Sequence, residues 1–211
     1  MRRTTVLLVA VMIAVALVVV TNAVAPTPAD AATSVVTKTF SNSQQITIPV
    51  GTSGAATPYP SEKNVSGFKQ GTILDVDLTL KNYTHAFPDD VDVLLSKENS
   101  GVNRTVMSDV GGSFPVNNIT LKLDDEATNG LLPDNGPLVG GRFKPTNVGS
   151  GDAFPAPAPA PDGRKALSGF DGLNPNGTWK LRVVDDFPLA DGGQFAGVGA
   201  SLSKPESSSS R

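Results

Sequence analysis

Apolar and polar residues alternate with a period of two along several short segments of the chain. In Thr72–Leu80 one set of alternating positions is apolar, Leu74, Val76, Leu78 and Leu80, while Asp75, Asp77 and Thr79 occupy the other set. This alternation is typical of a β-strand with one buried face and one solvated face. We therefore expect Leu74 to point inward with the other apolar residues.

Further strands are predicted by the same pattern. They cover Val35–Phe40, Gln45–Val50, Val91–Leu95, Ile119–Leu123, Thr178–Val184 and, more weakly, Gln194–Leu202. In Thr178–Val184, Trp179 faces the core, whereas Lys180 and Arg182 face solvent. Turn sequences such as Asn129-Gly130 separate these strands, and no segment has a sustained 3.6-residue period. The pattern predicts an all-β sandwich or barrel.

The first residues have the features of a secretory signal peptide. Arg2 and Arg3 precede an unbroken apolar run over Val6–Val20, and Ala29-Asp30-Ala31 forms a cleavage sequence with small residues at both ends. Fifteen apolar residues are few for a bilayer core of about 30 Å. We therefore predict a signal peptide over 1–31 and a secreted or cell-surface protein with no membrane segment after cleavage. The alternative is an uncleaved signal anchor.

The rest of the chain is predicted to form one β-sandwich domain over 32–203. Phe154–Pro161 has a proline at every second position and is expected to be a stiff surface loop rather than a linker between domains. Residues 204–211, Lys204–Arg211, are rich in serine and are predicted to be a disordered tail.

Charge and cysteine content exclude some classes of function. The net charge is −3, and it becomes −4 without residues 1–31, which contain two arginines and one aspartate. A mildly acidic chain is a poor candidate for nucleic acid binding. The chain has no cysteine, so an exported domain has no disulfides and depends on core burial, with metal as one further source of stability.

Three blocks of sequence resemble the P domain, or Homo B domain, of subtilisin-like proprotein convertases. The first block is Thr84–Ser96, in which His85, Phe87, Asp90, Val91, Val93 and Leu95 fall on the family pattern. The second joins Met107–Gly112 to Leu121–Ala127. The third joins Leu167–Phe170 to Asn174–Asp186 and ends at Asp191-Gly192-Gly193.

This resemblance to a stand-alone bacterial P domain implies a jelly-roll β-sandwich of the galactose-binding-like kind. It also implies a domain that stabilises or binds a protease without carrying the catalytic triad. The chain departs from the pattern at Ala86, where a threonine or serine is usual, and in Gly197–Leu202, which lacks the usual tryptophan.

An enzyme is the less favoured interpretation. The chain contains one histidine, His85, and has neither a G-x-S-x-G nor an H-E-x-x-H motif. We expect His85 to hydrogen-bond the neighbouring loop as a structural residue. A cryptic hydrolase that uses His85 as its general base, carrying the serine-type endopeptidase label of the family, is the alternative.

Aspartates cluster in three places and predict a calcium site. Calcium prefers six to eight hard oxygen ligands, many of them carboxylates. Asp90 and Asp109 are the first candidates because they fall in the family blocks, and the others are Asp92, Asp89, Asp125 and Asp186. Asp90 and Asp92 are expected to share one face of a strand. The alternative is that these aspartates only cap turns and keep the surface soluble.

The sequence leaves more than one class of binding partner open. The leading hypothesis is a non-catalytic module that binds a protein or a cell-surface glycan. A carbohydrate-binding or cell-surface structural module is the alternative, but the aromatic signal for sugar is weak: Trp179 is assigned to the core, and only Tyr59 and Tyr83 are expected to be exposed.

Overall fold

The computed structural model describes residues 34–69, 71–188 and 190–206. Within these residues the chain is an all-β sandwich of two sheets with two short 3-10 helices, η1 (Pro88–Asp90) and η2 (Leu167–Phe170). This confirms the predicted fold class at the level of an all-β sandwich. The predicted signal peptide lies outside the described residues. No helix in the described part is long and apolar enough to cross a membrane.

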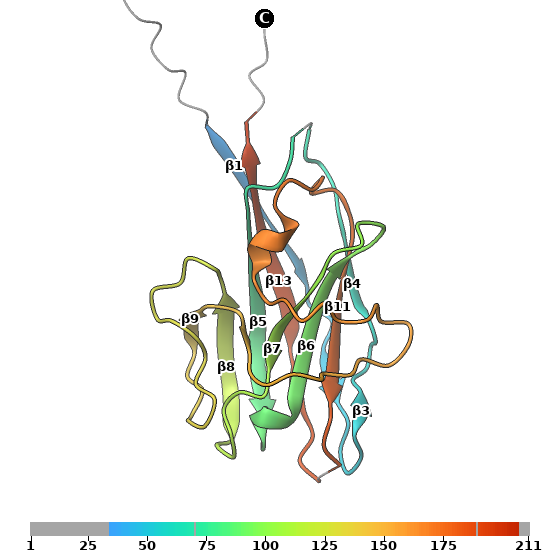
Figure 1. The fold of residues 1–211 in the computed structure, drawn as a ribbon, viewed down its shortest axis with the longest axis vertical. Coiled ribbons are helices and arrows are strands. Elements are labelled where there is room, and N and C mark those ends of the chain that lie inside the picture. The colour runs from blue at the N-terminus through green and yellow to red at the C-terminus, as the bar shows by residue number, and fades with distance from the viewer. Residues whose placement is uncertain (1–33, 70, 189, 207–211) are drawn as a thin grey trace, which may run out of the picture. The chain divides into compact units, whose positions relative to one another are not determined.

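The first sheet contains seven strands among the described residues and is built around the long strand β5 (Asp75–His85). On one edge, β5 pairs with β13 (Gly197–Pro205) and then with β12 (Gly193–Phe195). On the other edge it pairs with β8 (Val116–Leu123). The outer strands are β1 (Val35–Asn42), β2 (Ile46–Ile48) and β9 (Gly141–Phe143). Figure 1 shows β8 and β9 beside β5.

The second sheet contains six described strands and is built around β11 (Gly177–Asp185). One edge of β11 pairs with β6 (Val91–Lys97), and the other pairs with β4 (Ser61–Val65) and β3 (Gly54–Ala55). Beyond β6 lie β7 (Asn103–Ser108) and β10 (Thr146–Asn147). The β7–β10 and β8–β9 pairs are parallel, so both sheets are mixed.

The alternating apolar residues of both sheets meet in one buried cluster. Leu78 and Leu80 of β5 contribute from the first sheet, and Leu181 and Val183 of β11 from the second. Trp179 is 5% exposed and packs on Phe170 with ring centroids 5.0 Å apart. The core assignment of Trp179 is therefore confirmed, and the period-two pattern identified the face that is buried.

Several expectations about exposure are wrong. Leu74 precedes β5 and is 48% exposed, because the strand begins only at Asp75. Arg182, expected in solvent, is 4% exposed because its guanidinium donates to Ser96 Oγ and to the carbonyl of Pro157, in the predicted proline-rich loop. Tyr83 is fully buried and stacks on Phe195 at 4.5 Å.

The predicted boundaries of the last strand and the tail also differ. Gln194–Leu202 is two strands, β12 and β13, with Ala196 between them donating its N–H to Lys81. Lys204, assigned to the tail, is buried in β13, which continues to Pro205 because it pairs with β1 as far as Val35. Residues 207–211 lie outside the described part.

The strand register brings one end of each of four strands, β5, β6, β7 and β11, to the same end of the sandwich. His85 ends β5, η1 follows it, and Val91 begins β6 opposite Asp185 at the end of β11. Met107 near the end of β7 pairs with Val93. Figure 1 shows η1 at this end, opposite the end where β13 finishes beside the start of β1. The loops that follow β5, β7 and β11 therefore meet.

Candidate metal centre

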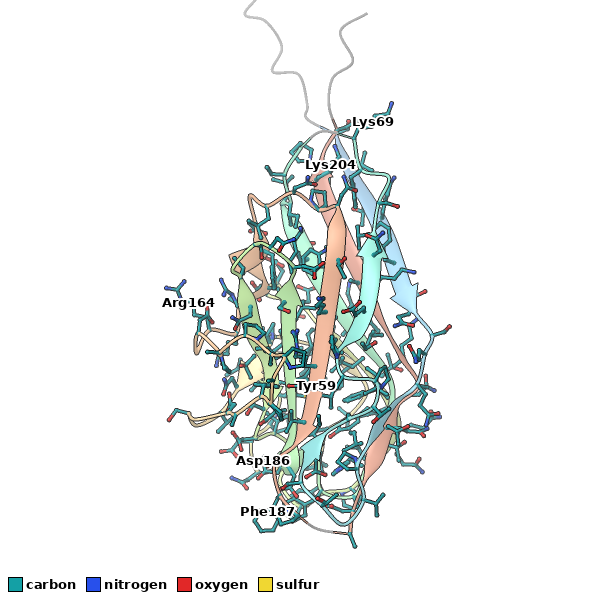
Figure 2. The ribbon with its side chains drawn as sticks, turned by 90° about the vertical axis from the view of Figure 1, so that its right-hand side faces the viewer. Tyr59, Lys69, Arg164, Asp186, Phe187 and Lys204 are labelled. Carbon is teal, nitrogen blue, oxygen red and sulfur yellow. The ribbon has the colours of Figure 1, made fainter. Side chains whose placement is uncertain are left out.

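Five of the six aspartates proposed from the sequence lie at the end where these loops meet. Asp89 and Asp90 belong to η1, Asp92 to β6, Asp109 follows β7 and Asp186 follows β11. We call this region the acidic end; it also contains Asp152, Asp185 and Asp191. Figure 2 shows Asp186 at the end of the domain opposite Lys69 and Lys204.

Asp92, Asp109 and Asp152 form the closest all-carboxylate group, which we call the carboxylate cluster. One oxygen from each lies within 4.8 Å of the others. Ligands of one calcium ion lie no farther apart than the diameter of its coordination shell, about 4.6–5.2 Å for bonds of 2.3–2.6 Å, and the three oxygens meet this condition. The geometry therefore suits a single calcium ion bound by all three carboxylates.

The loop conformations that build the carboxylate cluster are local and specific. Asp109 has a φ of 51°, a left-handed conformation that aspartate tolerates better than most residues. Asp152 follows a glycine-rich turn and reaches β7 because β10 pairs with it in parallel, Asn147 opposite Ser108. Ser108 Oγ lies 2.9 Å from Asp109 Oδ2 and 3.0 Å from Asp152 Oδ1. Asn147 Nδ2 donates to Asp152 Oδ2 at 2.8 Å.

No Lys or Arg among the described residues forms an ion pair with the carboxylate cluster. Asp92 is 2% exposed, and its Oδ2 has no hydrogen-bond partner among the described residues. Burial, reinforced by the charges of Asp152, Asp186 and Asp109, raises the pKa of Asp92 to about 8, against the opposing effect of a hydrogen bond with Ser108. Burial also raises the pKa of Asp109, although its contact with Ser108 opposes this. A bound divalent cation would remove this repulsion.

His85, Asp185 and Asp191 form a second group, the histidine cluster, in which one ligand atom from each lies within 4.8 Å of the others. His85 is 1% exposed and Asp185 is 0% exposed. The predicted structural hydrogen bond of His85 is confirmed: its Nδ1 either accepts the Phe87 N–H at 3.2 Å or, in the other tautomer, donates to the Phe87 carbonyl oxygen at 2.9 Å. Its Nε2 faces Asp185 Oδ2 at 3.4 Å.

Glycine at position 193 permits the close contact between β12 and the histidine. A Cβ there would lie 2.1 Å from the Thr84 carbonyl oxygen and 2.6 Å from Cδ2 of His85. Any larger residue would push β12 or the imidazole out of place. The Asp191-Gly192-Gly193 sequence thus places both a carboxylate, Asp191, and a closely packed strand residue, Gly193, next to His85.

Asp90 belongs to neither close group, contrary to its expected pairing with Asp92. It is the last residue of η1 rather than part of the strand that contains Asp92. Its Oδ2 is buried without a hydrogen-bond partner in the described part of the chain. Burial and the charges of Asp191, Asp185, Asp186 and Asp89 raise the pKa of Asp90 to about 7. After burial, the largest contributions to the pKa of Asp90 come from Asp191 and Asp185 of the histidine cluster.

Asp125 is placed apart from the acidic end. It follows β8, whose final residues pair with the middle of β5, far along that strand from His85. Its two carboxylate oxygens accept the backbone N–H groups of Leu167 and Ser168 at 3.0 and 2.7 Å. Asp125 therefore fits the alternative to calcium binding, in which an aspartate caps backbone N–H groups.

Three ligand candidates were not selected from the sequence. Asp152 lies in Gly149–Asp152, a turn with two glycines that is distant in sequence from the other candidates. Asp185 and Asp191 flank the β11–β12 loop. They belong to the same acidic stretch of sequence as Asp186, which was the one residue selected from it. The chemistry available at this end is binding of a hard cation by oxygen ligands and binding of a borderline cation by mixed nitrogen and oxygen ligands.

Comparison of the chain with protein-family models, curated proteins and solved structures gives no match. The resemblance to a P domain therefore stays a prediction from the three sequence blocks. The site is assigned only from its geometry.

Proposed function

We propose that this chain is a secreted, non-catalytic module that binds calcium at Asp92, Asp109 and Asp152 and uses the acidic end to bind a protein or a cell surface. The observation that carries this proposal is the buried carboxylate of Asp92, whose Oδ2 has no hydrogen-bond partner among the described residues, beside two further carboxylates. Three carboxylates supply up to six oxygen ligands, which is the lower limit for calcium.

Exposed apolar side chains at the same end support a role in binding. Phe187 is 52% exposed and Phe114 45% exposed, in loops that follow Asp186 and Asp109. Val50, 69% exposed, lies beside the loop that contains Phe187, since a Cβ on Gly192 would lie 2.3 Å from Val50 Cγ2. Figure 2 shows Phe187 at the tip of this end. Apolar side chains held around an ion site are suited to contact a partner.

The P-domain resemblance, with its jelly-roll topology, is part of this proposal and agrees with a sandwich whose loops carry the function. A non-catalytic role is supported by the burial of His85, which is 1% exposed and has Asp185 beside its Nε2. A hydrolase would instead turn over peptide or ester substrates and lose that activity in His85→Gln. A carbohydrate-binding module would bind on a glycan array.

Calcium titration by calorimetry tests the ion site. We expect the purified protein to bind one calcium ion at this site and Asp92→Asn and Asp109→Asn to lose that binding. Asp125→Asn is the matched control, because it removes the same charge from a carboxylate that only accepts backbone hydrogen bonds. Calcium binding that persists unchanged in Asp92→Asn would refute the assignment.

Retention on the envelope of the producing cells tests the binding surface. We expect Phe187→Ser with Phe114→Ser to reduce retention while leaving calcium affinity unchanged. The matched control is Leu131→Ser, which changes a side chain that is also 52% exposed but lies in the segment before β9. Equal loss in both variants would show that the acidic end has no special role.

A further inference from the structure

The histidine cluster joins the two sheets of the sandwich. His85 is the last residue of β5 in the first sheet, and Asp185 is the last residue of β11 in the second. Asp191 comes from the loop between β11 and β12. A ligand bound by all three would therefore link both sheets and this loop at one point.

Buried polar atoms with no hydrogen-bond partner converge on the histidine cluster. Within the described residues these are His85 Nε2, Asp185 Oδ2, both oxygens of Asp191 and the hydroxyl of Tyr83. Tyr83 is fully buried, and after burial the charges of Asp185, Asp90 and Asp191 contribute most to raising its pKa. Buried polar groups usually have partners, so several without one at the same place indicate a missing ligand.

The distance between His85 Nε2 and Asp185 Oδ2 fits metal coordination better than a hydrogen bond. It is 3.4 Å, beyond the usual range of about 2.7–3.2 Å for an N–H···O hydrogen bond. Two ligands of a tetrahedral zinc ion, each about 2.0–2.1 Å from the metal, lie about 3.3–3.4 Å apart. The third ligand atom, from Asp191, lies within 4.8 Å of both.

One tautomer of His85 holds the other imidazole nitrogen as it is held in metal-binding histidines. Nδ1 lies 2.9 Å from the Phe87 carbonyl oxygen, to which an Nδ1–H would donate, and 3.2 Å from the Phe87 nitrogen, whose N–H donates to Nδ1 in the other tautomer. An Nδ1–H that donates to this carbonyl leaves the lone pair of Nε2 directed at Asp185 and Asp191. Metal-ligating histidines almost always donate their second ring N–H in this way.

We propose that His85, Asp185 and Asp191 bind a divalent transition-metal ion of the zinc class at a site separate from the calcium site. One neutral imidazole and two carboxylates carry a charge of −2, which the ion neutralises. The nitrogen ligand favours zinc or a similar ion over calcium, which prefers oxygen ligands. In a chain without cysteine, the ion would replace a disulfide as the link between the sheets.

The single histidine makes this proposal directly testable by NMR. Imidazole nitrogen signals of the purified protein belong to His85 alone. After treatment with EDTA, titration with Zn²⁺ should move the Nε2 resonance and leave Nδ1 protonated. Co²⁺ in its place should give visible absorption bands of a four- or five-coordinate ion. An imidazole that carries protons on both nitrogens and does not respond to excess Zn²⁺ is a simple ion pair with Asp185 and would overturn the proposal.

Asp191→Asn is the decisive variant, because neither oxygen of Asp191 has a hydrogen bond in the described structure and folding should be little affected. We expect it to weaken Zn²⁺ binding by at least about tenfold and to leave Ca²⁺ binding intact. Asp92→Asn should do the reverse, so failure of one site is distinguished from failure of the other. Unchanged Zn²⁺ affinity in Asp191→Asn would overturn the assignment.

Discussion

Two groups of buried carboxylates in this domain differ in what neutralises them. Beside β5 and β8, Asp77 and Asp124 are accompanied by Lys122 and Arg142. Lys122 Nζ lies 2.8 Å from Asp77 Oδ2, and Arg142 forms an ion pair with Asp124. We call these four residues the balanced cluster. At the acidic end, no Lys or Arg of the described structure forms an ion pair with Asp92, Asp109, Asp152, Asp185 or Asp191.

The consequence of this difference appears in the protonation of the buried acids. Burial acts to raise the pKa of Asp124, but its contacts, including those with Asp77 and Arg142, lower it below its ordinary value. Asp92 forms no ion pair within the described part of the chain, and its pKa rises to about 8. A protein that uses its own lysine and arginine in one place and leaves carboxylates uncompensated in another has a place for an external cation.

The largest expected effect comes from removing the cation of the balanced cluster. Arg142→Gln leaves Asp124, which is fully buried, without its arginine. We expect a loss of about 2–3 kcal/mol in the free energy of unfolding, measured by urea denaturation and equal with calcium or EDTA. Lys144→Gln, which removes a charge from an exposed residue nearby, should change stability by less than about 0.5 kcal/mol. Equal losses would show that Asp124 does not depend on Arg142.

Removing a carboxylate at the acidic end should raise stability, rather than lower it, when no metal is present. Asp92→Asn removes a carboxylate whose charged form is disfavoured by burial and by repulsion from Asp152 and Asp109. In EDTA the variant should therefore be more stable than the unmodified protein by about 1–2 kcal/mol. Thermal unfolding in EDTA measures this. Destabilisation in EDTA would mean that Asp92 makes a favourable contact without any ion.

The balanced cluster should also show a pH dependence through Asp77. Burial and the neighbouring carboxylate of Asp124 raise the pKa of Asp77 to about 6, against the opposing effect of Lys122. Its folded-state pKa exceeds its unfolded value, so the stability it contributes is complete below about pH 4 and is lost as the pH rises through 6. Between pH 4 and pH 7, the free energy of unfolding of Asp77→Asn should therefore rise relative to that of the unmodified protein by on the order of 1 kcal/mol. Urea denaturation at each pH measures this difference. A difference independent of pH would contradict the shift.

The smallest effect is expected at Asp125. Asp125→Asn retains one acceptor oxygen but loses the charge that faces the N–H groups of Leu167 and Ser168. We expect a loss of about 0.5–1 kcal/mol and no change in the response to calcium. A smaller stabilisation by calcium in this variant would show that Asp125 is an ion ligand.

Much of the sandwich could be predicted from the sequence because period-two alternation reports burial on one face. β7 was missed because all six of its residues are buried and four of them are polar. Arg104 is buried by its bonds to Asp162 and the Ala166 carbonyl, and Asn103 by its bond to Ala160. A loop distant in sequence covers this strand, so its polar residues gave no strand pattern.

The site could be predicted only in part for a similar reason. Asp92 and Asp109 were identified because each lies in an acidic or glycine-rich block next to a strand. Asp152 was not, because only the parallel β7–β10 pair brings it beside Ser108. His85 was interpreted by its neighbour Phe87, whereas its second nitrogen faces residues a hundred positions away. Which residues come together in the site is determined by pairings between distant segments, and the local sequence does not reveal these pairings.

The thermal shift between calcium and EDTA, compared across three proteins, tests the central claim most directly. At a free calcium concentration 100 times Kd, binding adds about 2.7 kcal/mol, or a rise in Tm of about 5–10 °C for a domain of this size. We predict this shift in the unmodified protein, the same shift in the less stable Arg142→Gln, and none in Asp92→Asn. No shift in the unmodified protein, or a full shift in Asp92→Asn, would contradict the account.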